Sequence, residues 1–214
     1  MRLAGRAAAG LALLGAAGIH AATAGIVSVT AKTPAGAAAE DTVIVFDPLE
    51  APSTNRGSPG AGHSAKIDQI DKRFVPKVSV IATGTLVSLP NSDSIRHEVY
   101  SHSPPHPFKI KLYAPDHHED VLFDKPGLLV LGCNIHDSMV AFVVVVDSPY
   151  FAKILASGSR DMNVPAGRYR LRVWHPKSRT AIEPREITVG TEPMTLPLII
   201  DLDPSRGTAP ELPD

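Results

Sequence analysis

The sequence predicts an all-β protein, and three observations support this prediction. Val, Ile and Thr gather in short runs, and turn-forming residues separate the runs. The 214 residues include 20 Pro and 16 Gly, which favours short strands joined by turns. No segment shows a convincing helical period. A chain of this length can bury the core of one large domain or of two small ones.

The first residues have the pattern of an export signal. Arg2 and Arg6 precede an apolar stretch of small residues, and Ala22-Thr23-Ala24 fits a signal-peptidase site. We therefore expect residues 1–24 to be a signal peptide that is removed after Ala24. The stretch is short and only weakly hydrophobic, so no stable membrane span is predicted. The mature protein is then periplasmic or secreted.

The charge distribution excludes one class of partner. The formal net charge is -1, and Lys and Arg nowhere form a cluster larger than a pair. Proteins that bind DNA or RNA need a basic surface to neutralise phosphates. No nucleic acid partner is expected.

Strand-like segments follow one another from residue 25 to residue 203. The first two, 25–30 and 41–46, are joined by a turn with Pro34 and Gly36. Residues 51–66 are rich in Pro, Gly and Ser and predict a linker. Residues 67–147 hold the densest strand pattern, with partial alternation typical of a sandwich. Expected strands there are 74–82, 86–89, 97–101, 108–113, 120–123, 128–132 and 139–147.

The last third of the chain continues this pattern. Strands are expected at 151–154, 166–175, 186–189 and 195–202. Residues 204–214 are rich in Pro and charge, and predict a flexible tail.

Cys133 is the only cysteine, so an exported protein needs a reason to keep it. An intermolecular bridge, a buried inert thiol, a nucleophile and a metal ligand all remain possible for an isolated thiol. Cys133, His136 and Met139 follow one another at intervals of three, on a predicted loop between two apolar strands. All three side chains can therefore enter one pocket at the end of a sandwich.

A second imidazole has to come from another segment. His97 begins a predicted strand and is the first candidate, and the competing histidines are His102, His106, His117 and His118. Two imidazoles, one thiolate and a weakly bound thioether form the ligand set of electron-transfer copper sites.

The Cys-x-x-His-x-x-Met loop resembles that of the cupredoxins, with a spacing similar to the amicyanin-like members. The runs Leu89-Pro90-Asn91-Ser92-Asp93, His97-Glu98-Val99-Tyr100 and Gly132-Cys133-Asn134-Ile135-His136-Asp137 resemble periplasmic proteins described as methylamine-utilisation or plastocyanin-like. The resemblance covers roughly residues 67–147. It implies a cupredoxin Greek-key β-sandwich with one type 1 (blue) copper ion. By this resemblance His97, Cys133 and His136 are the strong ligands and Met139 is the axial one.

The flanking segments resemble a different fold. GIVSVT and DTVIVF are similar to the opening strands of a carboxypeptidase-regulatory-like sandwich, and VPAGRYRLRVWHP to its closing strand. This implies a second, smaller immunoglobulin-like β-sandwich built from residues 25–50 and 148–203, with the cupredoxin domain inserted into it. Two domains in linear order are the alternative.

Other residues have a plain interpretation beside a functional one. Cys133 and Met139 can be ordinary core residues, and His117–Asp120 is either a second metal site or an exposed turn. Asn91 is expected to hold the backbone near His97, as outer residues orient metal ligands. Ile135 and Pro105 are candidates for an apolar docking patch near His136.

The sequence therefore predicts an exported electron-transfer protein that cycles between Cu(II) and Cu(I). Its expected partners are redox proteins that bind transiently. A copper carrier, and a surface-binding module with structural copper, are the alternatives. We do not expect an enzyme, because Met139 has no role in a Cys–His nucleophile pair and four protein ligands leave no position for a substrate.

Overall fold

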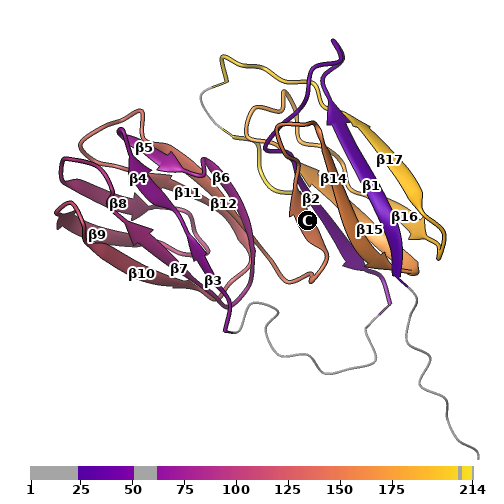
Figure 1. Ribbon diagram of the computed structural model, residues 1–214, viewed down its shortest axis with the longest axis horizontal. Coiled ribbons are helices and arrows are strands. Elements are labelled where there is room, and N and C mark those ends of the chain that lie inside the picture. The colour runs from indigo at the N-terminus through magenta and orange to yellow at the C-terminus, as the bar shows by residue number, and fades with distance from the viewer. Residues whose placement is uncertain (1–23, 51–61, 207–208, 214) are drawn as a thin grey trace, which may run out of the picture.

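The computed structural model describes residues 24–50, 62–206 and 209–213, which form strands and contain no helix (Figure 1). The predicted all-β class is confirmed. Within these ranges, no helix is long and apolar enough to cross a membrane. The expected signal peptide lies outside the described residues except for Ala24, which is the first residue of a strand.

The inner sandwich occupies the centre of the chain. One sheet has five strands in the order β6-β12-β11-β8-β9, and the facing sheet has three, β10-β7-β3. A short ribbon, β4-β5, lies beside them. The bounds are β3 Ser64–Lys66, β4 Asp68–Ile70, β5 Arg73–Val75, β6 Val78–Ala82, β7 Thr85–Pro90, β8 His97–Ser101, β9 Phe108–Tyr113, β10 His118–Phe123, β11 Gly127–Gly132 and β12 Val140–Val146.

The outer sandwich combines the first two strands with the last five. Its sheets have the orders β14-β1-β17 and β13-β2-β15-β16. Figure 1 shows the indigo strands β1 and β2 among the orange and yellow strands from the end of the chain. This pairing is the one expected for an interrupted sandwich. The bounds are β1 Ala24–Lys32, β2 Val43–Pro48, β13 Phe151–Lys153, β14 Ser159–Pro165, β15 Gly167–Trp174, β16 Arg185–Val189 and β17 Met194–Ile199.

Strand β12 is covered on both faces, which explains its unbroken apolar sequence. Ala141, Val143 and Val145 belong to the core of the inner sandwich. Phe142, Val144 and Val146 belong to a cluster that also contains Val43, Val45 and Trp174 of the outer sandwich. The rings of Phe142 and Trp174 are 5.7 Å apart between centroids. Alternation is lost because neither face of β12 meets water.

Two predicted boundaries are wrong. Residues 64–66, placed in the linker, form β3 and pair in parallel with β7, because this short strand completes the hydrogen bonding of a sheet edge. Residues 204–214 were expected to be a flexible tail, yet Pro210 is buried and its carbonyl accepts a hydrogen bond of 3.0 Å from the Trp174 indole. The buried indole needs an acceptor, and the tail supplies it.

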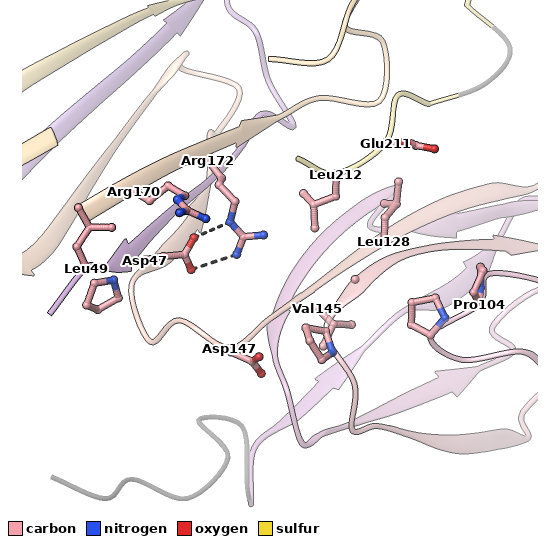
Figure 2. A pocket seen from close by; sticks show the side chains of 14 residues that line it. Asp47, Leu49, Pro104, Leu128, Val145, Asp147, Arg170, Arg172, Glu211 and Leu212 are labelled. Carbon is pink, nitrogen blue, oxygen red and sulfur yellow. Dashed lines mark hydrogen bonds and ion pairs between the residues drawn. The ribbon is translucent and has the colours of Figure 1, made fainter. Parts of the chain in front are cut away.

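An open cleft of about 980 Å³ separates the two sandwiches beside this contact. Figure 2 shows Arg172 and Asp47 on one wall, joined by hydrogen bonds of 2.5 and 3.1 Å, and Leu128 and Pro104 on the other. Pro105 also lines the cleft and touches Gly127, where a Cβ would lie 2.6 Å from Pro105 Cγ. Pro105 therefore lies by the end of β11 that is remote from Cys133, and its expected place near His136 is wrong.

His175 predicts a pH dependence of folding. Its Nε2 lies 2.9 Å from the Glu40 carbonyl oxygen and donates to it, and its Nδ1 accepts the Lys177 N–H at 2.9 Å. Burial lowers the pKa of His175 below its ordinary 6.5, against the opposing effect of the Glu40 carbonyl. The unfolded state then binds the proton more readily, so stability is lost as the pH falls below about 6.5.

We expect the free energy of unfolding to fall as the pH falls from about 7.5 to about 5. His175→Asn should reduce this fall because it removes the titrating imidazole, and the Asn oxygen can still accept the Lys177 N–H. Denaturant titrations of both proteins measure the effect. An equal pH dependence in the two proteins would contradict it.

Candidate metal centre

His97 is the first residue of β8 and is fully buried, with 0% of its surface exposed. Its Nε2 lies 3.0 Å from Asp93 Oδ2, and its Nδ1 lies 3.6 Å from Cys133 Sγ. A carboxylate only accepts hydrogen bonds, so the ring proton belongs on Nε2. Nδ1 then carries a free lone pair on the side of the ring that is near Cys133, so this nitrogen can bind a metal ion there.

Cys133 and His136 come from the loop between β11 and β12. Cys133 directly follows β11 and is 2% exposed, and His136 is half-buried. The loop is a tight turn, because the Met139 N–H donates to the His136 carbonyl at 2.9 Å. Met139 is buried and packs in the same cluster as Cys133.

The ligand atoms of His97, Cys133 and His136 all lie within 4.8 Å of one another. The two imidazole rings are 5.4 Å apart between centroids. His136 Nδ1 is buried, and no donor or acceptor in the described part of the chain is paired with it. An unpaired polar atom costs free energy when it is buried, so this nitrogen fits a metal ligand. The three residues can hold one metal ion.

Asn91 fixes the segment that leads into β8, as the sequence predicted. Its Nδ2 donates to the Ile95 carbonyl at 2.9 Å and to the Tyr113 carbonyl at 3.3 Å. Its Oδ1 accepts the Asp93 N–H at 3.1 Å. Asn91 therefore orients both the backbone before His97 and the residue that holds its ring.

Asp93 is a residue of the site that the sequence did not predict. Besides His97, its Oδ2 accepts the Lys72 N–H at 2.7 Å. This backbone hydrogen bond and the one from His97 lower the pKa of Asp93 to about 2. The side chain is therefore a carboxylate at neutral pH. A spacing of four residues between Asp93 and His97 was the available signal, but a loop does not fix which side chains meet.

The ribbon β4-β5 supports this loop from outside. Lys72 lies in its turn, where Asp71 and Lys72 have φ values of 49° and 58°. Asp68, in β4, accepts hydrogen bonds from the Ser92 N–H at 3.2 Å and the Ser92 hydroxyl at 3.0 Å. The loop before His97 is thus anchored at two neighbouring residues.

The competing histidines do not join the cluster. His102 is exposed and lies against Tyr100, with 4.9 Å between ring centroids. The His106 Nε2 accepts the Lys125 N–H at 2.9 Å. His117 and His118 are exposed, and His118–Asp120 begin β10 instead of forming a turn. Of the described residues, only His97, Cys133 and His136 form a group of three convergent metal-binding side chains.

Comparison with known proteins gives likenesses in structure alone. No protein-family model and no curated protein matches the sequence. A purple cupredoxin from Nitrosopumilus maritimus is 20% identical, with a TM-score of 0.35, over 38% of this chain and 99% of its own. Amicyanin from Paracoccus versutus is 16% identical, with a TM-score of 0.37, over 50% of this chain and 100% of its own.

A copper-containing nitrite reductase from Thermus scotoductus SA-01 is 22% identical, with a TM-score of 0.37. The match covers 47% of this chain and 25% of the reductase. Each of these matches covers half of this chain or less. The assignment of the metal centre rests on its own side chains.

Proposed function

We propose that the protein binds one copper ion through His97, Cys133 and His136, with Met139 as a weaker fourth ligand, and that it transfers single electrons. The observation that carries this proposal is the buried Cys133 sulfur facing His97 Nδ1 at 3.6 Å, next to the unpaired His136 Nδ1. One thiolate and two imidazoles beside a thioether are the ligands of electron-transfer copper sites.

When bound, copper supplies a one-electron couple between Cu(II) and Cu(I). The chain's own residues hold the ligands in place for both states. Asp93 fixes the His97 ring, and the turn from His136 to Met139 fixes the loop. Ligands held in this way need little rearrangement when the charge changes. With four side chains as ligands, no position is left for a substrate, which supports electron transfer over catalysis.

We also propose that the protein works in the periplasm or outside the cell, with redox proteins as transient partners. The N-terminal residue pattern supports export. His136 is half-buried and Ile135 is 50% exposed, so the loop reaches the surface. A partner can therefore approach the site from this side.

The visible and electron paramagnetic resonance spectra of the copper-loaded, oxidised protein test the proposal. We expect an intense thiolate-to-copper band that disappears on reduction and returns on oxidation, with copper retained. A protein that releases copper when it is reduced is a carrier. A colourless protein that prefers zinc would contradict the copper site.

Met139→Leu tests the fourth ligand. Leu is close to Met in volume, so the core stays packed at a cost below about 1.5 kcal/mol. Because the thioether is a weak ligand, we expect the variant to keep its copper and colour but to change its reduction potential. Voltammetry measures the change. A potential equal to that of the wild type would show that Met139 is a core residue only.

A further inference from the structure

A groove of about 440 Å³ lies beside the metal-binding loop. Its lining comes from β5 and the residues after it on one side, and from the end of the loop and the start of β12 on the other. The lining residues are Arg73, Phe74, Val75, Lys77, Ser138 and Val140. Ser138 and Val140 flank Met139, so the groove adjoins the proposed copper site.

The side of the groove that carries Lys77 is fixed to β12. The Lys77 carbonyl accepts the Phe142 N–H at 2.9 Å, and β6 then pairs in parallel with β12 from Val78 onward. Phe74 is buried beneath the groove, whereas Val75 is 45% exposed. The groove is therefore part of the folded surface, with an apolar floor.

The rim of the groove is cationic, although the whole chain has a net charge of -1. Arg73 and Lys77 line it, and no acidic residue does. Within the described ranges, the Lys77 ammonium has no hydrogen-bond or ion-pair partner. Arg73 is 3.7 Å from Asp71, but both side chains are more than 70% exposed, and such pairs hold a charge only weakly. Lys77 is therefore free to meet an external anion, and Arg73 can exchange its weak contact with Asp71 for one.

We propose that this groove is the docking surface for an acidic redox partner protein, which places carboxylates against Arg73 and Lys77. The inference rests on the proposed electron-transfer function. The apolar side chains of Phe74, Val75 and Val140 in the lining give the contact a short-range component. Opposite charges at a rim accelerate encounter more than they tighten binding. This suits a partner that must leave after each electron.

Two forms of one probe test the proposal with the copper-loaded full chain. Mitochondrial cytochrome c is cationic, and succinylation of its lysines makes it anionic. Stopped-flow spectroscopy measures electron transfer from each reduced form to the oxidised protein. We expect the anionic form to react with a rate constant that falls as ionic strength rises, because salt screens the attraction.

Lys77→Glu should slow the reaction with the anionic form by about three- to tenfold at low ionic strength and accelerate the reaction with the cationic form. Arg73→Glu should act in the same direction. Lys125→Glu is the matched control, because Lys125 is exposed and precedes β11, whose other end leads to Cys133. We expect it to leave both rates close to those of the wild type, with an unchanged copper spectrum in every variant.

The outcomes separate this inference from the proposed function. If the copper exchanges electrons with both forms but Lys77→Glu changes neither rate, the docking surface is overturned and the proposed function stands. If Lys77→Glu slows only a small anion such as hexacyanoferrate(II), the groove is a small-anion site, which also overturns it. If neither form reduces the copper of the wild type, the electron-transfer function itself fails.

Discussion

Cys133→Ser is expected to abolish the intense visible band of the copper-loaded, oxidised protein and to weaken copper binding by more than about 100-fold, since even residues that only orient ligands cost 10- to 100-fold. The band requires a bond between copper and the Cys133 sulfur. Serine is similar in size to cysteine, so the buried position is not emptied. Absorption spectra and competition with a copper chelator measure the two effects.

Asn134→Ser is the matched control for this variant. Asn134 is the neighbour of Cys133 on the same loop, and it is exposed. We expect it to keep the band and the affinity. A Cys133→Ser protein that stays intensely coloured would contradict the ligand assignment, and an unfolded one, seen by circular dichroism, would instead identify a structural thiol.

Asp93→Asn and Asp93→Ala are expected to have the second largest effect. Asparagine removes the negative charge near His97 but can still accept a hydrogen bond from the ring. A nearby negative charge favours Cu(II) over Cu(I), so its loss should raise the reduction potential. Alanine removes the acceptor as well, and should in addition weaken Cu(II) binding by about 10- to 100-fold. Voltammetry and chelator competition measure these changes.

Asp137→Asn controls for charge alone. Asp137 is exposed and lies on the metal-binding loop next to His136. We expect a smaller shift in potential, because solvent screens an exposed charge. An equal shift from Asp137→Asn would show that Asp93 acts only through its charge and not through its contact with His97.

The cluster of His97, Cys133 and His136 could be predicted from the sequence, because local spacing decides much of it. Two ligands share one short loop, and the third begins a strand. Asp93 could not be predicted in the same way. Its carboxylate is held by the backbone of Lys72, in a ribbon 21 residues earlier, and the sequence does not show that this ribbon lies over the loop. The role of Met139 as the fourth ligand is also not decided by its position, because a buried Met139 fits a ligand and a core residue equally well.

The fold shows a similar division. Many strand segments followed from β-branched runs and turn residues, but β3, β4 and β14 were not expected, and the single strand expected at 74–82 is two strands, β5 and β6. The apolar run of β12 indicated burial but did not say that a second sandwich covers Phe142, Val144 and Val146. The tail was misjudged because Pro-rich segments have little to bury by themselves. The acceptor that Trp174 needs lies 36 residues away along the chain.

The interrupted sandwich also sets an order of assembly. β1 and β2 are synthesised first, yet β1 pairs with β14 and β17, and β2 pairs with β13 and β15, all of which begin at or after Phe151. Every strand from β3 to β12 precedes these partners along the chain. The metal-binding unit can therefore fold while β1 and β2 still lack their neighbours. Closing the outer sandwich joins strands that are far apart along the chain, so we expect it to be slower than strand pairing within the inner sandwich.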